Sequence, residues 1–172
     1  MRPGVHFGGL LSSTTVTFDL DGFTEGRSWP WLQPETAILV WDPAQKGRIV
    51  SGSQLFGSVT WWMFWKNGFE PLAALDNNGD GWLTGDELEG IGVWQDRNGN
   101  GISDAGEVTP AREFGIIAIG AHSMGEVDGV LANRNGVILR DGRALTLFDW
   151  VPKSSAALDR GSRHVVGRVG NN

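Results

Sequence analysis

The chain has 172 residues, with 20 acidic against 14 basic side chains, a formal net charge of −6, 40% hydrophobic residues and no cysteine. This length and composition predict one folded domain rather than a disordered chain. The missing cysteines exclude disulfide frameworks, cysteine-ligated zinc and thiol catalysis, and an acidic chain without a basic stripe argues against nucleic-acid binding.

The first expected elements are two strands and a helix. Residues 16–20 (VTFDL) and 37–41 (AILVW) are β-rich runs bounded by Gly, Pro and Asp, which is typical of strands. Residues 53–65 begin with a serine that can cap a helix and carry apolar side chains at positions 55, 59 and 62. We therefore expect a mostly buried helix there. Its apolar part, residues 55–65, is 11 residues long, too short for a membrane span, which needs about 20.

Short helices and a strand are expected next. Residues 68–75 and 86–95 have helical patterns, although two glycines weaken the second. Residues 109–115 indicate a helical turn that begins with proline and ends at glycine. Residues 116–120 (IIAIG) then indicate a buried strand.

The end of the chain shows a hairpin signal followed by a weakly patterned tail. Residues 137–140 and 143–151 flank an Asp-Gly pair, which favours a tight β-turn between two strands. We expect one domain over residues 1–152 and a loose basic tail over residues 153–172. The fold expected from these elements is α+β, with an EF-hand-like calcium-loop core, short helices, several short strands and a C-terminal β-hairpin.

The negative charge is confined to one segment. Residues 76–107 contain eight acids and one base, a net charge of −7, so the other 140 residues sum to +1. The segment begins DNNGDGWLTGDE, which matches the twelve-residue EF-hand loop, with oxygen ligands at positions 1, 3, 5, 7, 9 and 12 and glycine at position 6. The six predicted ligands are Asp76, Asn78, Asp80, the Trp82 carbonyl, Thr84 and Glu87.

A second loop, DRNGNGISDAGE, starts 20 residues later. Its predicted ligands are Asp96, Asn98, Asn100, the Ile102 carbonyl, Asp104 and Glu107. Ser103 stands at position 8, which is normally apolar, so we expect a weaker β-bridge behind this loop. Many hard oxygens in a tight, flexible loop suit a hard cation, and two complete matches predict two Ca²⁺ sites rather than an acidic turn region without an ion.

A third, degenerate loop can be aligned on Asp42. Gly47 and Ile49 occupy positions 6 and 8, but Lys46 stands where a cation would need an oxygen ligand. We interpret it as a loop that kept its fold and lost its ion. Only eight residues separate the two complete loops, so one helix would have to serve both. We therefore expect the Asp42 loop to be the partner of the Asp76 loop, 34 residues downstream.

Each complete loop has three acidic ligands, which predicts dissociation constants of about 10⁻⁵ to 10⁻³ M. Sites this weak fill outside a cell and stay largely empty in a resting cytosol. The sequence thus favours structural calcium in an extracytoplasmic protein: secreted, periplasmic or on the cell surface. The N-terminus is a poor signal peptide, although a processed chain would have lost one.

Five segments of the chain are informative together: FDLDG at 18–22, LFG at 55–57, NGFEPLAALDNNGDG at 67–81, VWQDRNGNGISDAGEV at 93–108 and EFGIIAI at 113–119. They resemble a bacterial calcium-binding domain found in large secreted RTX-type proteins, including their self-processing modules, and in single-domain relatives. The resemblance to the self-processing modules implies calcium-triggered cleavage of an Asp-Pro bond at the N-terminal edge of the domain. The one Asp-Pro bond here, Asp42-Pro43, lies inside the degenerate loop instead.

The chain contains nine tryptophans and no tyrosine. Trp61, Trp62 and Trp65 make the expected helix apolar all round, so it either packs in the core or docks a protein partner. A carbohydrate platform is less favoured, because stacking sites usually add exposed polar groups.

No catalytic motif is apparent, since His6, His122 and His164 are isolated and HExxH, GxSxG and P-loop patterns are missing. We predict a non-enzymatic calcium-binding module with a cell-surface or secreted binding or assembly role. The alternatives are a subunit that docks through the tryptophan-rich segment and a calcium-triggered self-processing module.

Overall fold

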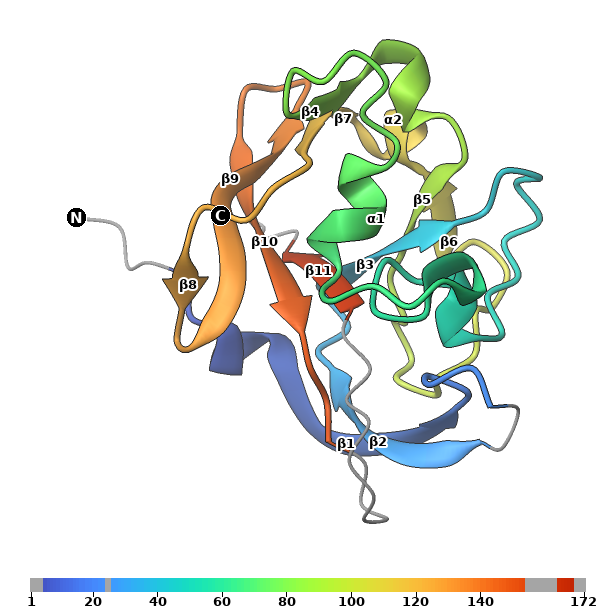
Figure 1. The fold of residues 1–172 in the computed structure, drawn as a ribbon. Helices are drawn as coiled ribbons and strands as arrows, with labels where there is room; N and C mark the ends of the chain where they lie inside the picture. Colours follow the sequence, from blue (N-terminus) through green and yellow to red (C-terminus); the bar gives the residue numbers. More distant parts are fainter. Residues whose placement is uncertain (1–4, 24–25, 154–163, 169–172) are drawn as a thin grey trace.

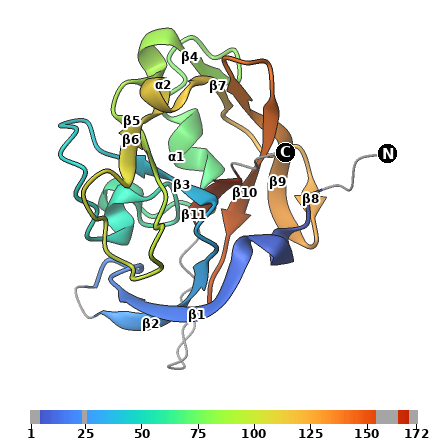
Figure 2. The same ribbon diagram turned by 180° about the vertical axis from the view of Figure 1, so that it is seen from behind.

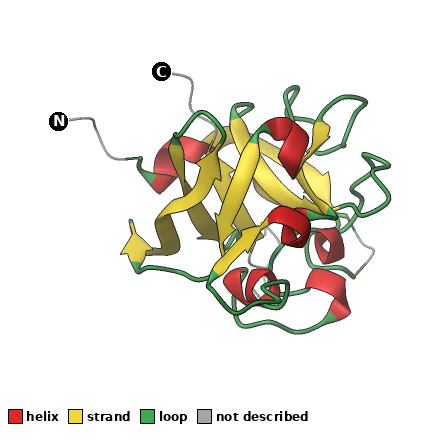
Figure 3. Cartoon of the chain, turned by 90° about the horizontal axis from the view of Figure 1, so that it is seen from above, coloured by secondary structure: helices red, strands yellow, loops and turns green. Residues whose placement is uncertain are grey.

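The computed structural model describes residues 5–23, 26–153 and 164–168, and strands dominate it (Figure 1). Strands account for 40% of the structure and helical turns for 16%. The expected α+β fold around an EF-hand core is therefore wrong, and the fold is β-sandwich-like. Seen from above, the strands fill the middle and short helical turns lie around them (Figure 3).

Two sheets organise the strands. A two-stranded antiparallel ribbon joins β1 (Leu11–Phe18) to β2 (Arg27–Leu32) and runs below the larger sheet in Figure 1. The larger sheet has the order β4-β7-β9-β10-β11-β3-β5-β6, with β8 paired to β9. Its strands are β3 (Thr36–Trp41), β4 (Trp82–Thr84), β5 (Ile91–Trp94), β6 (Val108–Pro110), β7 (Ile116–Gly120), β8 (Glu126–Val127), β9 (Val130–Leu139), β10 (Ala144–Trp150) and β11 (His164–Arg168).

The helical elements are all short. The α-helices are α1 (Phe69–Ala73) and α2 (Ala111–Phe114), and the 3₁₀ turns are η1 (Phe7–Leu10), η2 (Gly52–Gln54), η3 (Thr60–Trp62) and η4 (Gly85–Leu88). Among the described residues, no helix is long and apolar enough to span a membrane, in agreement with the sequence prediction.

Several predicted elements are confirmed. The hairpin β9–β10 turns at Asp141-Gly142, where Gly142 has φ 86° and the Asp141 carboxylate accepts the backbone N–H of Arg143 at 3.0 Å. Helix α2 ends at Gly115, which has φ 99°. Helix α1 and the strands β3 and β7 also lie where the sequence predicts a helix and strands. Each of these elements is encoded by a local signal, either turn residues or a short apolar run, which is why the sequence predicted them.

The helix expected over residues 53–65 is not formed. The segment contains two 3₁₀ turns, and Trp61 and Trp62 have positive φ values of 56° and 60°. The buried hydroxyl of Thr60 accepts the N–H of Gly57 at 2.7 Å and lies 2.6 Å from the carbonyl oxygen of Leu55, to which it can donate. These side-chain bonds replace the backbone pairing that a helix needs, so the segment turns back on itself.

The helix expected over residues 86–95 is also wrong, because η4 is followed by the buried strand β5. Gly90 separates the two with φ 82°, and a Cβ there would come within 2.7 Å of the Trp41 ring. Strand β5 pairs with β3 on one side and β6 on the other. The two complete loops are therefore joined through a sheet strand and share no helix.

Strand β11 lies within the segment that the sequence analysis expects to be a loose tail. Its backbone pairs antiparallel with β10 on one side and β3 on the other. Residues 164–168 thus occupy the middle of the larger sheet, and the tail prediction fails for them; residues 154–163 and 169–172 lie outside the described part of the chain.

The larger sheet carries a hydrophobic cluster on each face. Alternation along β3 places Ile38 and Val40 in one cluster and Leu39 in the other, and in β10 Phe148 and Leu147 separate in the same way. The first cluster packs against the β1–β2 ribbon, and the second packs against α1 and β4. The view from behind shows the ribbon on one side of the larger sheet (Figure 2).

Candidate metal-binding loops

One hydrogen bond recurs in all three loops identified from the sequence. The carboxylate at position 1 accepts the backbone N–H of the glycine at position 6, and each of these glycines has a positive φ. The pairs are Asp42 with Gly47 at 2.7 Å, Asp76 with Gly81 at 2.8 Å and Asp96 with Gly101 at 2.7 Å. The three segments therefore share one tight turn, as the sequence alignment predicts.

In the first loop, the carboxylates at both ends bind the backbone of the turn. Asp76 also accepts the N–H of Gly79 at 2.8 Å, and Asp80 accepts that of Trp82 at 2.8 Å. The Glu87 carboxylate accepts the N–H of Asn77 at 2.8 Å. The first and twelfth positions thus lie on one compact turn, although ten residues lie between them in the chain.

The remaining predicted positions of this loop are at its surface. Asn78 accepts the N–H of Asp80 at 2.8 Å through its carbonyl oxygen and donates to the Asp80 carboxylate at 3.0 Å through its amide nitrogen. Thr84 is exposed, whereas Trp82 is half-buried. The first loop therefore faces solvent along most of its length.

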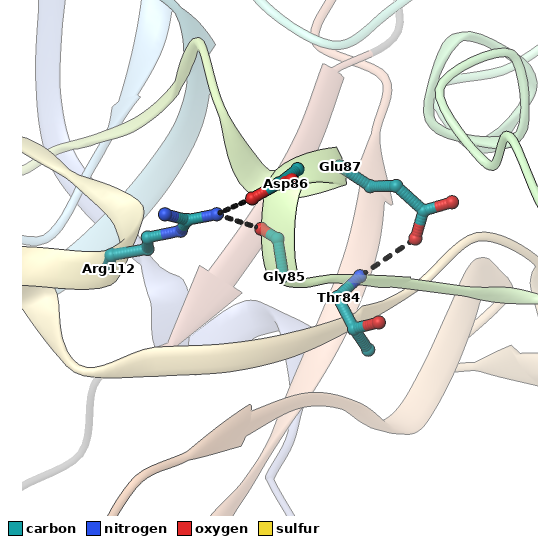
Figure 4. Close-up of polar contacts among 5 residues, drawn as sticks. All are labelled: Thr84, Gly85, Asp86, Glu87 and Arg112. Atoms are coloured by element: carbon teal, nitrogen blue, oxygen red, sulfur yellow. Dashed lines mark hydrogen bonds and ion pairs between the residues drawn. The ribbon is translucent and has the colours of Figure 1, made fainter.

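Arg112, from α2, supports the turn that closes the first loop (Figure 4). Its guanidinium donates to the Gly85 carbonyl and lies 3.2 Å from the Asp86 carboxylate. On the next residue, Glu87 reaches back to accept the N–H of Thr84 at 3.1 Å, which holds the carboxylate toward the loop. Sequence reasoning did not find Arg112, because nothing in the loop motif refers to a residue 25 positions beyond Glu87.

The second loop repeats the backbone pattern. Asp96 accepts the N–H of Gly99 at 2.8 Å in addition to that of Gly101, and Glu107 accepts the N–H of Arg97 at 2.9 Å and of Asp104 at 3.1 Å. The closing glutamate returns to the start of the loop here as in the first loop. The two loops therefore present their end carboxylates, at positions 1 and 12, in equivalent positions.

The two asparagines of the second loop both turn to Asp104. The amide nitrogens of Asn98 and Asn100 lie 2.7 Å and 2.9 Å from one oxygen of that carboxylate. These two bonds, Asn98 first, hold the pKa of Asp104 below its ordinary value. Ile102, whose carbonyl is the predicted ligand at position 7, has an exposed side chain.

The end carboxylates of the second loop are buried, in contrast to those of the first. Asp96 is 5% exposed and Glu107 is 6% exposed. Each accepts an indole N–H from the core: Trp31 Nε1 lies 2.6 Å from Asp96, and Trp94 Nε1 lies 3.5 Å from Glu107. Sequence reasoning missed the role of Trp31, which comes from a strand 65 residues before the loop.

The degenerate loop pairs with the second loop, so the expected pairing with the first loop is wrong. Ile49 donates its backbone N–H to the Ser103 hydroxyl at 2.8 Å, and that hydroxyl lies 3.3 Å from the Ile49 carbonyl oxygen. Leu83, at position 8 of the first loop, instead lies in β4 opposite Ile119 of β7. Ser103 thus uses its side chain where we expected only a weakened backbone bridge.

The Asp42-Pro43 bond borders a cleft between the degenerate loop and α2. Lys46, Glu89 and Arg112 also line this cleft. Asp42 donates its own N–H to the Gly90 carbonyl at 2.8 Å, and its carboxylate accepts the N–H groups of the degenerate loop. The bond therefore lies inside the folded domain, away from either edge.

Both complete loops are rich in oxygen donors. Their side-chain donors are carboxylate, amide and hydroxyl oxygens, the ligand types that Ca²⁺ takes. Among the residues that the structure describes, no three acidic or histidine side chains converge closely enough to hold a metal as they stand. In the loops, the carboxylates are satisfied by backbone N–H groups and by asparagine amides.

The structure defines a class of protein, a β-sandwich-like domain in which three loops share one tight turn closed by an Asp–Gly hydrogen bond. The chain belongs to the SPM domain family, whose model matches residues 3–149. It is also similar to the iron-regulated protein FrpA of Neisseria meningitidis serogroup C, with 37% identity over 91 residues. That match covers 50% of this chain and 8% of FrpA, so the chain spans only a small part of that relative.

Proposed function

We propose that this domain is a non-enzymatic calcium-binding module in which two Ca²⁺ ions, one in each complete loop, stabilise the fold for a binding or assembly role. The observation that carries the proposal is the repeated arrangement of the end carboxylates. In both loops the position 1 aspartate accepts the position 6 glycine N–H, and the position 12 glutamate returns to the N–H of position 2. Sequence-distant oxygens are thereby held on one side of a tight turn.

The charge of the segment supports a structural role for the cation. Seven net negative charges lie within residues 76–107, and two Ca²⁺ ions would add four positive charges there. Because repulsion among these carboxylates opposes the compact state, a divalent cation that binds only the folded loops stabilises it. The expected dissociation constants of about 10⁻⁵ to 10⁻³ M suit the calcium levels outside a cell. We therefore infer an extracytoplasmic location: secreted, periplasmic or at the cell surface.

Calcium titration and thermal melting test this proposal. Isothermal titration of chelator-treated protein should give two Ca²⁺ per chain, and excess EDTA should lower the melting temperature. Glu87→Gln and Glu107→Gln should each remove one site, whereas Lys46→Gln in the degenerate loop should remove neither. An unchanged melting curve in EDTA together with no heat of binding would overturn the proposal.

A second candidate function, docking to a protein partner, is favoured by an apolar patch formed by Trp62, Met63 and Phe64. All three are exposed, and the Phe64 side chain is 90% exposed. Trp61 and Trp65 pack edge to face beneath the patch, with ring centres 6.1 Å apart. Although the predicted helix is absent, its tryptophan-rich segment therefore still presents apolar surface. Light scattering after size exclusion tests self-association through this patch: Phe64→Ser would leave the mass of a monomer unchanged but would dissociate an oligomer.

A further inference from the structure

One hydrogen bond from a buried side chain joins the second loop to strand β2 of the β1–β2 ribbon. Trp31 lies in β2, is fully buried, and places its indole nitrogen 2.6 Å from one oxygen of Asp96. An indole has one donor and no acceptor, so this bond uses its whole hydrogen-bonding capacity. The same oxygen of Asp96 accepts the N–H of Gly101, which fixes the orientation of the carboxylate at position 1.

The other strand of the ribbon contacts the loop as well. A Cβ on Gly101 would lie 2.8 Å from the Cβ of Val16 in β1, so the backbone of the loop rests directly on that strand. Behind this contact, the rings of Phe18, Trp31 and Trp94 pack against one another with centres 5.7 to 5.8 Å apart. Both strands of the ribbon therefore contact the loop at its first and sixth positions.

The first loop lacks this connection in the described part of the chain. A Cβ on Gly81, the equivalent glycine, would meet only the edge of His122 at 3.7 Å. Its closing turn is held by Arg112, whose side chain and that of its partner Asp86 are largely exposed. The two loops thus share the hydrogen bonds of their first and twelfth positions and differ in what lies behind them.

We propose that Trp31 is a positioning residue for the second loop, and that cation binding there is coupled to the packing of the β1–β2 ribbon. This inference rests on the proposed calcium function. A charge-assisted hydrogen bond from a rigid, buried donor orients the Asp96 carboxylate before the cation arrives. By linkage, a cation that binds the oriented carboxylate stabilises the packed ribbon to the same extent.

Substitution of Trp31 by phenylalanine tests the positioning role, with Trp29 as the matched control. Trp29 lies in the same strand, is also buried, and donates its indole N–H to the Phe18 carbonyl at 2.9 Å instead of to a loop residue. In calcium titrations, Trp31→Phe should weaken one of two sites by about 10- to 100-fold and leave the other unchanged. Trp29→Phe should leave both sites unchanged.

Hydrogen exchange tests the coupling without substituting a core residue. Calcium should slow amide exchange in β1 and β2 of the unaltered domain and of Glu87→Gln, which retains the second loop. In Glu107→Gln this protection of the ribbon should be lost. The comparison remains informative even if Trp31→Phe does not fold.

The outcomes separate the two proposals. An unaltered domain that binds no calcium would overturn the proposed function. Two calcium sites, with equal affinities in Trp31→Phe and Trp29→Phe, would overturn the positioning role of Trp31 while the proposed function stands. Equal calcium protection of the ribbon in Glu87→Gln and Glu107→Gln would overturn the coupling.

Discussion

The hydroxyl of Ser103 lies 2.8 Å from the backbone nitrogen of Ile49 and so joins position 8 of the second loop to position 8 of the degenerate loop. In an EF-hand pair, a backbone bridge at position 8 joins two ion-binding loops. Here a loop with Lys46 at position 5 provides one side of the bridge. The degenerate loop thus acts as a structural partner of the second loop.

Ser103→Ala should destabilise the domain by about 1 kcal/mol, because the Ile49 N–H then loses its partner in a half-buried position. Chemical denaturation at saturating calcium measures this loss. Ser13→Ala, at an exposed position of β1, is the control and should change the free energy of unfolding little. Equal stability of the two variants would show that the bridge contributes nothing.

Gly101→Ala and Gly79→Ala separate backbone strain from steric conflict. Both glycines have positive φ, 73° at Gly101 and 71° at Gly79, so each alanine should cost about 1–2 kcal/mol through its backbone. Only the Cβ at position 101 would also meet Val16, at 2.8 Å, whereas nothing lies within 4 Å of one at position 79. Gly101→Ala should therefore cost about 1–3 kcal/mol more in urea denaturation. Equal losses would mean that the loop moves freely away from β1.

The Asp42-Pro43 bond should stay intact when calcium is added. The Asp42 carboxylate accepts the N–H groups of Lys46 at 3.1 Å and Gly47 at 2.7 Å, so it is held away from attack on its own carbonyl carbon. Incubation with calcium followed by mass spectrometry should show one chain of unchanged mass. Heating in dilute acid, which hydrolyses Asp-Pro bonds, provides the marker fragments 1–42 and 43–172. Their appearance with calcium at neutral pH would instead support self-processing.

Docking of the N-terminal turn η1 should depend on pH through Asp128. The backbone N–H of Phe7, 2.8 Å away, is the main cause that lowers the pKa of the Asp128 carboxyl, and the His6 side chain adds to it. Because the pKa of the Asp128 carboxyl is lower in the folded state, the stabilisation by its carboxylate is fully present above the unfolded-state pKa of about 3.9. This stabilisation is lost as the pH falls through the lower pKa of the folded state.

The pH dependence of this stabilisation can be checked by comparing the melting temperature of Asp128→Asn with that of the unaltered domain. The variant should be the less stable of the two at pH 7, and the difference in melting temperature should shrink toward zero in acid below about pH 4. Glu35→Gln, at an exposed position in the turn before β3, is the control for loss of one negative charge. A difference that is constant from pH 7 to acid would contradict the role of the Asp128 carboxylate.

The features predictable from the sequence are those encoded within a few consecutive residues. The twelve-residue loops and the Asp141-Gly142 hairpin depend on glycines and short polar side chains at fixed spacings, and both lie where expected.

The features that the sequence did not reveal were missed for physical reasons. Strand β5 is buried on both faces, and a continuous apolar run of this length has no periodicity that separates a strand from a helix. In residues 53–65, hydrogen bonds of the Thr60 hydroxyl stabilise turns in place of the helix that the apolar pattern predicts. The Trp31–Asp96 bond, finally, spans 65 residues and depends on the completed fold, so no local signal could reveal it.

The position of β11 has a consequence for the order in which the domain can form. Its backbone joins β10 to β3, so without it the larger sheet is two separate groups of strands, β4-β7-β9-β10 with β8 and β3-β5-β6. During synthesis, β3 and β10 each keep an unpaired edge until residues 164–168 have left the ribosome, and such edges invite pairing with other chains. The sheet therefore closes at its centre only when β11 joins β10 to β3.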